Sequence, residues 1–239
     1  MQRRNLPKSS HKTTPTLTLP PRGGGKGEGE AITYYPAFIN LQGKRVIVVG
    51  GGKVAERKIF ALLKAGARIT VISPRLTRRI TIGKLRGRIK HIPRQYRKGD
   101  VKNAFLAIAA TDSYQINKKV SEDALCLVNV VDTPSLCNFI VPSVIQRGHL
   151  TIAISTSGVS PALSKTIRQE IEKLYGSQFM KYLRFLEKIR GKAMEEIRDQ
   201  EKRTKFLRSF GTMDIVKMLR EKGFKKVKKK ITRSIEQGA

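Results

Sequence analysis

Residues Arg45–Val49 read RVIVV, and Gly50-Gly51-Gly52-Lys53-Val54-Ala55 follows directly. The apolar run predicts a buried strand, and the loop has the pattern G-x-G-x-x-A ahead of a predicted helix over Val54–Ala65. In this pattern the first glycine permits a tight turn, the second lets backbone approach a pyrophosphate, and the alanine lets helix pack closely on strand. The stretch therefore predicts a Rossmann-like α/β fold whose loop residues 50–55 hold a dinucleotide. An ordinary glycine-rich turn is the alternative.

Short apolar runs recur along the chain to about residue 155. Five more of them predict strands: Arg68–Ile72, Ile89–Pro93, Ala104–Ala110, Leu125–Val131 and Leu150–Ser155. Several are apolar on both faces, which is typical of parallel strands covered by helices on both sides. Stretches of helical length lie between them at Val54–Ala65, Tyr114–Ala124 and Phe139–Gln146. This alternation predicts a doubly wound parallel sheet.

The chain divides into three predicted parts. Residues 1–32 are rich in Ser, Thr, Pro, Gly and basic residues, which predicts a disordered basic tail. Residues 33–149 form the predicted dinucleotide-binding domain. Beyond Gly158 the strands stop, and Ser160-Pro161 has the form of a helix N-cap with Pro at the first helical position. Residues 150–239 are predicted to form a smaller, mainly helical domain, too polar for a large core of its own and therefore stabilised in a dimer.

Basic residues strongly outnumber acidic ones: 49 Lys+Arg against 18 Asp+Glu give a formal net charge of +31. A surface of this sign attracts anions, which include nucleic acid, acidic lipids and small polycarboxylates. No apolar run approaches the ~18 residues of a membrane span, and no signal-peptide-like stretch stands at the start. We therefore expect a cytoplasmic protein with no membrane partner. Cys126 and Cys137 form no CxxC pair, so neither a zinc site nor a disulfide framework is predicted.

The ends of the predicted strands supply the next candidates, because reacting groups in such folds gather at the carboxyl edge of the sheet. An acid that bonds the adenosine ribose is expected after the second strand, but Ser73-Pro74-Arg75 stands there. Nothing then repels a 2′-phosphate, and Arg75 could pair with one, so the residues leave both NAD and NADP open. Pro74 and Arg75 are assigned to the cofactor site, with a surface loop as the alternative.

Two acids follow the later strands: Asp112 closes AFLAIAATD and Asp132 closes LVNVVD. Asp132 is the first choice for proton chemistry, because the end of the fifth strand would face the group that lies against the nicotinamide. A cap of the turn at Thr133 is the alternative. Thr111 and Asp112 are assigned to the cofactor, and Asp112 could instead cap the helix near Tyr114.

The segment Ser155-Thr156-Ser157-Gly158-Val159-Ser160 carries four hydroxyls ahead of a helix start. Backbone N–H groups and hydroxyls together can form an anion cradle for substrate carboxylates, and a capped loop is the alternative. Ser155, Thr156, Ser157 and Ser160 are therefore candidates for substrate binding. Asn129, in the NVVD stretch, is added to this set.

Four stretches taken together, INLQGKRVIVVGGGKVAERK, AIAATD, NVVDTPSLCNFIVPS and ISTSGVSPAL, resemble the precorrin-2 dehydrogenase family in their order and spacing. The same module forms the N-terminal part of bifunctional siroheme synthases. The resemblance covers about residues 35–175 and thins over the helical C-terminus. It implies oxidation of precorrin-2 to sirohydrochlorin with NAD as hydride acceptor. It further implies that Asp132 is the catalytic acid/base and that the chain forms a homodimer.

The implied substrate is an anionic tetrapyrrole, which a basic protein would concentrate near its surface. Some members also insert ferrous iron as a substrate, but this chain shows no dedicated His/Cys/Glu cluster. Ferrochelation therefore stays open, and no metal-ligating residue is assigned. One alternative function is nucleic-acid binding. The content of 6% aromatic residues with no Trp argues against it, because single-stranded nucleic acid stacks its bases on aromatic side chains. The other is a non-catalytic dinucleotide-sensing regulator, which would have no need of Asp132.

Overall fold

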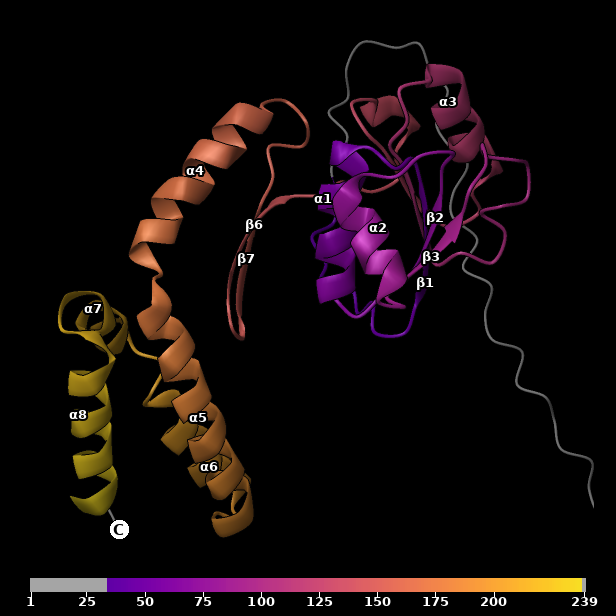
Figure 1. The fold of residues 1–239 in the computed structure, drawn as a ribbon. Coiled ribbons are helices and arrows are strands. Elements are labelled where there is room, and N and C mark those ends of the chain that lie inside the picture. Colours follow the sequence, from indigo (N-terminus) through magenta and orange to yellow (C-terminus); the bar gives the residue numbers. More distant parts are fainter. Residues whose placement is uncertain (1–33, 238–239) are drawn as a thin grey trace, which may run out of the picture. The chain divides into compact units, whose positions relative to one another are not determined.

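A computed structural model describes residues 34–237 (Figure 1). The predicted tail at 1–32 lies outside the described residues. The described chain forms two compact units, one over Ala37–Phe139 and one that contains residues 34–36 and the chain from Ile140 onward. The division expected at 149/150 falls inside the second of these units.

The first unit contains a five-stranded sheet in the order β3-β2-β1-β4-β5, and every neighbouring pair is parallel. This order confirms the predicted doubly wound α/β fold. The five strands predicted in this unit are present, three of them shorter than predicted by one to three residues in total. Their bounds are β1 Arg45–Val49, β2 Arg68–Ile72, β3 Ile89–Ile92, β4 Leu106–Ala109 and β5 Leu127–Val130.

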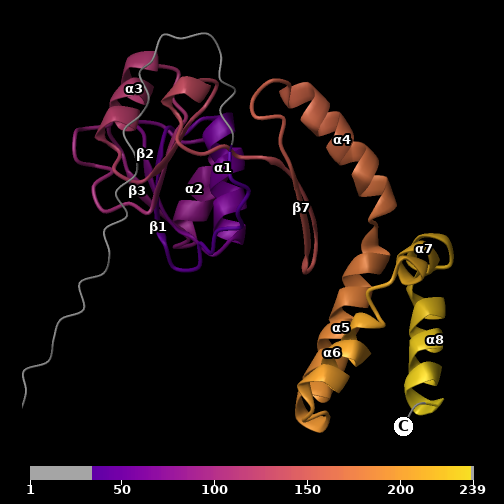
Figure 2. The same ribbon diagram turned by 180° about the vertical axis from the view of Figure 1, so that it is seen from behind.

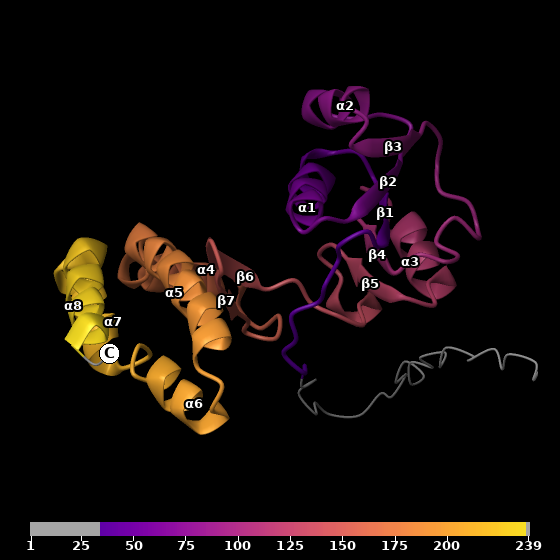
Figure 3. The ribbon, with the colours of Figure 1, turned by 90° about the horizontal axis from the view of Figure 1, so that it is seen from below.

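Helices cover both faces of this sheet. Figure 3 shows α1 (Lys53–Lys64) and α2 (Arg78–Leu85) on one side and α3 (Tyr114–Asp123) on the other. Successive residues of β1 alternate between the two layers: Val46 and Val48 pack with α1, whereas Ile47 and Val49 pack with α3. A strand buried on both faces reads as continuously apolar, which is why Val46–Val49 are all apolar, whereas Arg45 at the start of β1 is exposed. The sequence did not predict α2.

The helix predicted over Phe139–Gln146 is wrong. Residues Ser143–Arg147 form β6, which pairs antiparallel with β7, Leu150–Ile154. Pro142 disfavours a helix through this segment, and exposed Val144 next to buried Ile145 has the period of a strand. Gly148, with φ +62°, makes the tight turn between the strands. The predicted strand over Leu150–Ser155 therefore belongs to a separate two-stranded sheet.

The second unit continues with five helices: α4 Pro161–Leu174, α5 Ser177–Glu196, α6 Gln200–Arg208, α7 Met213–Glu221 and α8 Gly223–Gln237. Their core gathers Phe179, Tyr182, Leu219, Val227 and Ile231. Figures 1 and 2 show α5 and α8 running side by side. Within the described part of the chain, no helix is both long and apolar enough to cross a membrane. The cytoplasmic location stays a prediction.

Candidate functional site

The three glycines after β1 meet different surroundings. Gly50 has φ +115°, and a Cβ there would lie 2.2 Å from the carbonyl oxygen of Ala110. A Cβ on Gly51 would lie 2.1 Å from the carbonyl oxygen of Arg75. At Gly52 a Cβ would meet nothing within 4 Å. The first two glycines are therefore required by backbone packing, whereas Gly52 faces open space.

A cleft of about 630 Å³ opens beside this loop, at the carboxyl ends of β1, β2 and β4. Seven residues assigned to the cofactor line it: Gly50, Gly51, Gly52, Pro74, Arg75, Thr111 and Asp112. Lys53, Val54 and Ala55 do not, and Ala55 is fully buried where α1 packs on the sheet. The edge where β1 separates β2 from β4 is where doubly wound sheets bind ligands, because the chain connections diverge there.

The cleft fits a dinucleotide at its phosphate end. Gly52 is the N-cap of α1 and supplies no side-chain capping bond, so the first N–H groups of the helix are left for a ligand. The space that a Cβ at Gly52 would occupy is open to the same groups. After β2, the hydroxyl of Ser73 donates to the carbonyl oxygen of Arg75 at 2.7 Å and fixes the loop in which an acid was expected.

At the end of β4, Thr111 and Asp112 play different parts. The Thr111 hydroxyl donates to Oδ1 of buried Asn117 at 2.8 Å, and the Asn117 amide donates to the Thr111 carbonyl at 2.9 Å. Ser113 rather than Asp112 caps α3, because its hydroxyl accepts from the N–H of Ile116. The helix-cap interpretation of Asp112 is therefore wrong, and its exposed side chain lies on the wall of the cleft.

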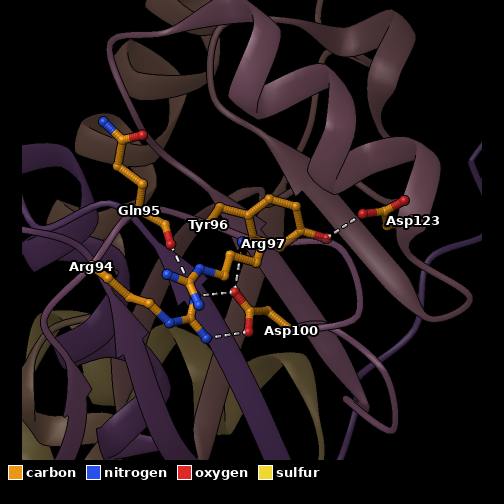
Figure 4. A network of polar contacts seen from close by, with 6 residues as sticks. All are labelled: Arg94, Gln95, Tyr96, Arg97, Asp100 and Asp123. Carbon is orange, nitrogen blue, oxygen red and sulfur yellow. Dashed lines mark hydrogen bonds and ion pairs between the residues drawn. The ribbon is translucent and has the colours of Figure 1, made fainter.

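Gln95 and Tyr96, which the sequence analysis missed, form a further part of the wall. Figure 4 shows how their loop is held: Arg94 binds both carboxylate oxygens of Asp100, at 2.8 and 2.7 Å. The Tyr96 hydroxyl donates to Asp123 at the end of α3, at 2.7 Å. Burial together with this bond raises the pKa of Tyr96, and the bond from Arg94 lowers the pKa of Asp100.

Asp132 stands in the turn after β5, on the same carboxyl edge of the sheet. Its φ is +58°, in the left-handed region, and its side chain is exposed. Its carboxylate makes no hydrogen bond or ion pair with any residue between 34 and 237. The short 3-10 helix at Pro134–Leu136 begins without a side-chain cap, so the turn-cap alternative lacks its bond. Residues held in such a conformation without a structural bond are concentrated at functional sites.

Lys58 on α1 is a functional candidate that the sequence analysis missed. Burial lowers the pKa of its ammonium group and Arg57 lowers it further, while Cys137 and Asp132 act in the opposite direction. Lys58 therefore senses the charge of the Asp132 carboxylate. Nothing in the helical pattern of α1 marks this proximity, because it arises only when α1 packs against the sheet.

The candidates for substrate binding separate into bonded and free groups. The Asn129 amide, in buried β5, donates to the carbonyl oxygen of Phe139 at 3.2 Å. In the second unit, the Thr156 hydroxyl donates to the carbonyl oxygen of Ser160, and the Ser160 hydroxyl caps α4, as predicted. Ser155 accepts from the N–H of Ser157. The Ser157 hydroxyl is exposed and has no bond to another described residue.

Comparisons with known proteins agree with this division of the chain. A family model described as NAD(P)-binding matches residues 37–143, and one for the central part of the sirohaem biosynthesis protein matches residues 147–174. The siroheme synthase of Thioalkalivibrio sulfidiphilus is 41% identical over 180 residues, 73% of this chain and 36% of that protein. That of Mannheimia succiniciproducens is 32% identical over 203 residues, 84% of this chain and 43% of that protein.

A solved structure of SirC, precorrin-2 dehydrogenase, matches with a TM-score of 0.71 and 27% identity. The match covers 84% of this chain and all of SirC. The chain belongs to the precorrin-2 dehydrogenase and siroheme synthase family. It carries an NAD(P)-binding domain followed by a helical region. It spans between a third and a half of the length of the siroheme synthases named above.

The NAD(P)-binding match supports a nicotinamide dinucleotide as the cofactor of this chain, and the open phosphate end of the cleft at Gly52 is compatible with such a ligand. The sequence motifs placed Gly52, Asp112 and Asp132 at the carboxyl edge of the sheet because each follows two or three residues after the end of a strand. They could not locate Tyr96 or Lys58, whose positions depend on how a loop and a helix pack.

Proposed function

We propose that this chain oxidises precorrin-2 to sirohydrochlorin with NAD as the hydride acceptor. The observation that carries the proposal is Asp132: an exposed carboxylate without a hydrogen-bond partner among the described residues, at the carboxyl edge of the sheet whose cleft suits the dinucleotide. The bound nicotinamide would accept a hydride from the substrate. Removal of two hydrogens also requires a base for the proton, and Asp132 is the residue suited to take it.

The other residues would position the reacting groups and hold the dinucleotide and the substrate. Gly52 and the first turn of α1 receive the pyrophosphate, and Pro74 and Arg75 border the adenosine end. The Lys58 ammonium group interacts with the charge of the Asp132 carboxylate and would help to position it. The Ser157 hydroxyl is available for a substrate carboxylate. Ferrochelation stays a prediction from the resemblance, with ferrous iron as a substrate. No group of three potential metal ligands is found among residues 34–237.

Anaerobic incubation with precorrin-2 and either NAD or NADP tests the proposal. We expect the sirohydrochlorin spectrum and reduced nicotinamide to appear in equal amounts, faster with NAD. Asp132→Asn should lower the rate about 10²–10⁴-fold with dinucleotide affinity unchanged, because the amide retains the shape and loses the base. Asp112→Asn is the matched control, because it alters a strand-end acid on the cofactor wall and should change dinucleotide affinity more than the maximal rate.

Two outcomes would contradict the proposal. Near-normal turnover by Asp132→Asn would remove its role as the base. Tight dinucleotide binding without any oxidation of precorrin-2 would favour the sensing regulator instead.

A further inference from the structure

A second hollow of about 570 Å³ lies within the helical unit, between α5 and α8. Its floor is apolar: Phe185 and Ile189 come from α5, and Phe224 comes from α8. The rings of Phe185 and Phe224 meet edge to face, with centroids 6.0 Å apart. Its volume is that of a site for one small organic molecule.

Five cations surround this floor: Lys181, Arg184, Lys188 and Lys192 on α5 and Lys228 on α8. The four on α5 are spaced three and four residues apart, which places them along one face of the helix. Like charges at this spacing destabilise a helix. Among the described residues none of the five has an ion-pair partner. The one acid that lines the hollow, Glu236, forms no ion pair either.

An apolar floor within a rim of unpaired cations complements a flat apolar molecule whose edge carries several carboxylates. We propose that this groove binds the anionic tetrapyrrole. This inference rests on the proposed function, which supplies a polycarboxylate of that shape as substrate and product. The groove would hold the tetrapyrrole on the helical unit through contacts that do not involve Asp132 or the glycine loop.

The groove suits a small polycarboxylate better than nucleic acid. Single-stranded nucleic acid requires exposed aromatic side chains on which successive bases stack. Here Phe185 and Phe224 pack against each other and are only partly exposed. The hollow also holds one compact ligand rather than a length of backbone.

The test is fluorescence titration of the full chain with uroporphyrin, a tetrapyrrole polycarboxylate that this reaction does not consume. Lys188→Gln with Lys228→Gln removes one cation from each side of the groove. Lys202→Gln with Lys217→Gln is the matched control, because it removes the same charge from exposed positions on α6 and α7. We expect the groove variant either to bind one uroporphyrin fewer per chain or to bind that uroporphyrin with an affinity about tenfold or more lower. The affinity of the control should stay within about twofold of that of the unaltered chain.

Two results would overturn the inference. One is equal binding of uroporphyrin by the groove variant and the control. The other is displacement of uroporphyrin by a short oligonucleotide or polyglutamate at a lower concentration than by a second, non-fluorescent tetrapyrrole polycarboxylate. Circular dichroism of both variants establishes that they are folded. Precorrin-2 oxidation, measured separately, distinguishes the two hypotheses. A chain that oxidises precorrin-2 but shows no groove-dependent binding refutes the groove alone. A chain that binds uroporphyrin in the groove without oxidising precorrin-2 refutes the proposed function alone.

Discussion

At the scale of single residues, the glycines of the loop after β1 differ in their roles. Some are required for folding, and one leaves space for a ligand. Gly50 and Gly51 are in close contact with backbone carbonyls, so a side chain at either position forces the loop to move. Gly52 has an ordinary φ of −79° and open space around it. A side chain at Gly52 is therefore compatible with folding.

We predict that Gly52→Val abolishes measurable dinucleotide binding while the melting temperature changes by only a few degrees. The branched side chain would occupy the space that the pyrophosphate requires. Calorimetric titration with NAD and NADP measures the first effect and thermal unfolding the second. As a control, Gly50→Ala should lower the melting temperature markedly, because its Cβ meets the Ala110 carbonyl. Unchanged affinity of Gly52→Val for both dinucleotides would remove the cofactor assignment.

Lys58 leads to a prediction about its own ionisation. Asp132 raises the pKa of the Lys58 ammonium group, whereas burial and Arg57 lower it. Asp132→Asn removes one of the raising charges, so the pKa of Lys58 should fall further, which NMR titration of the labelled lysine side chain measures. Asp112→Asn is the control and should leave the Lys58 pKa unchanged. A Lys58 pKa that Asp132→Asn does not lower would show that the two side chains do not interact.

At the scale of elements, the loop after β3 depends on Asp100. The depressed pKa of Asp100 means that its carboxylate stabilises the fold above its unfolded pKa of about 3.9, and that this contribution is lost as pH falls through the folded value. The unfolding free energy of Asp100→Asn should therefore be about 1 kcal/mol below that of the unaltered chain at neutral pH. This difference in unfolding free energy between Asp100→Asn and the unaltered chain should disappear below about pH 4. A difference that is constant with pH would exclude the Arg94–Asp100 pair as its source.

The sequence predicted the elements that follow local rules. The apolar residues Val46–Val49 predicted a buried strand, and Ser160-Pro161 predicted a helix start. Prediction from the sequence failed where pairing with another segment decides the structure. Residues Ser143–Arg147 form a strand because β7 pairs with them across a tight turn. The constraint on Gly51 was likewise invisible, because the carbonyl that restricts it belongs to Arg75, far along the chain.

At the scale of the whole molecule, the second unit carries apolar surface that a partner copy would cover. Its β6–β7 sheet has only two strands, which is marginal for an independent sheet. Val144 on β6 and Leu163 on α4 are exposed by 44% and 52%. Both observations favour the homodimer that the family resemblance implies.

We predict that light scattering gives a mass of two chains for the full-length protein at micromolar concentration. Val144→Lys and Leu163→Lys should each shift the mass toward that of one chain, because a charge buried in an apolar contact is costly. Lys217→Gln, on α7, is the control and should leave the mass unchanged. A full-length monomer that still oxidises precorrin-2 would refute the dimer.

The strand order also has a consequence for synthesis of the protein. β1 lies between β2 and β4, and its second edge is completed only when Val46 pairs with Leu106. While the ribosome makes the segment between them, this buried central strand keeps one edge unpaired. Such an edge is a template for association between nascent chains. Chaperone binding during translation should therefore be strongest before β4 emerges and should fall once β4 has paired.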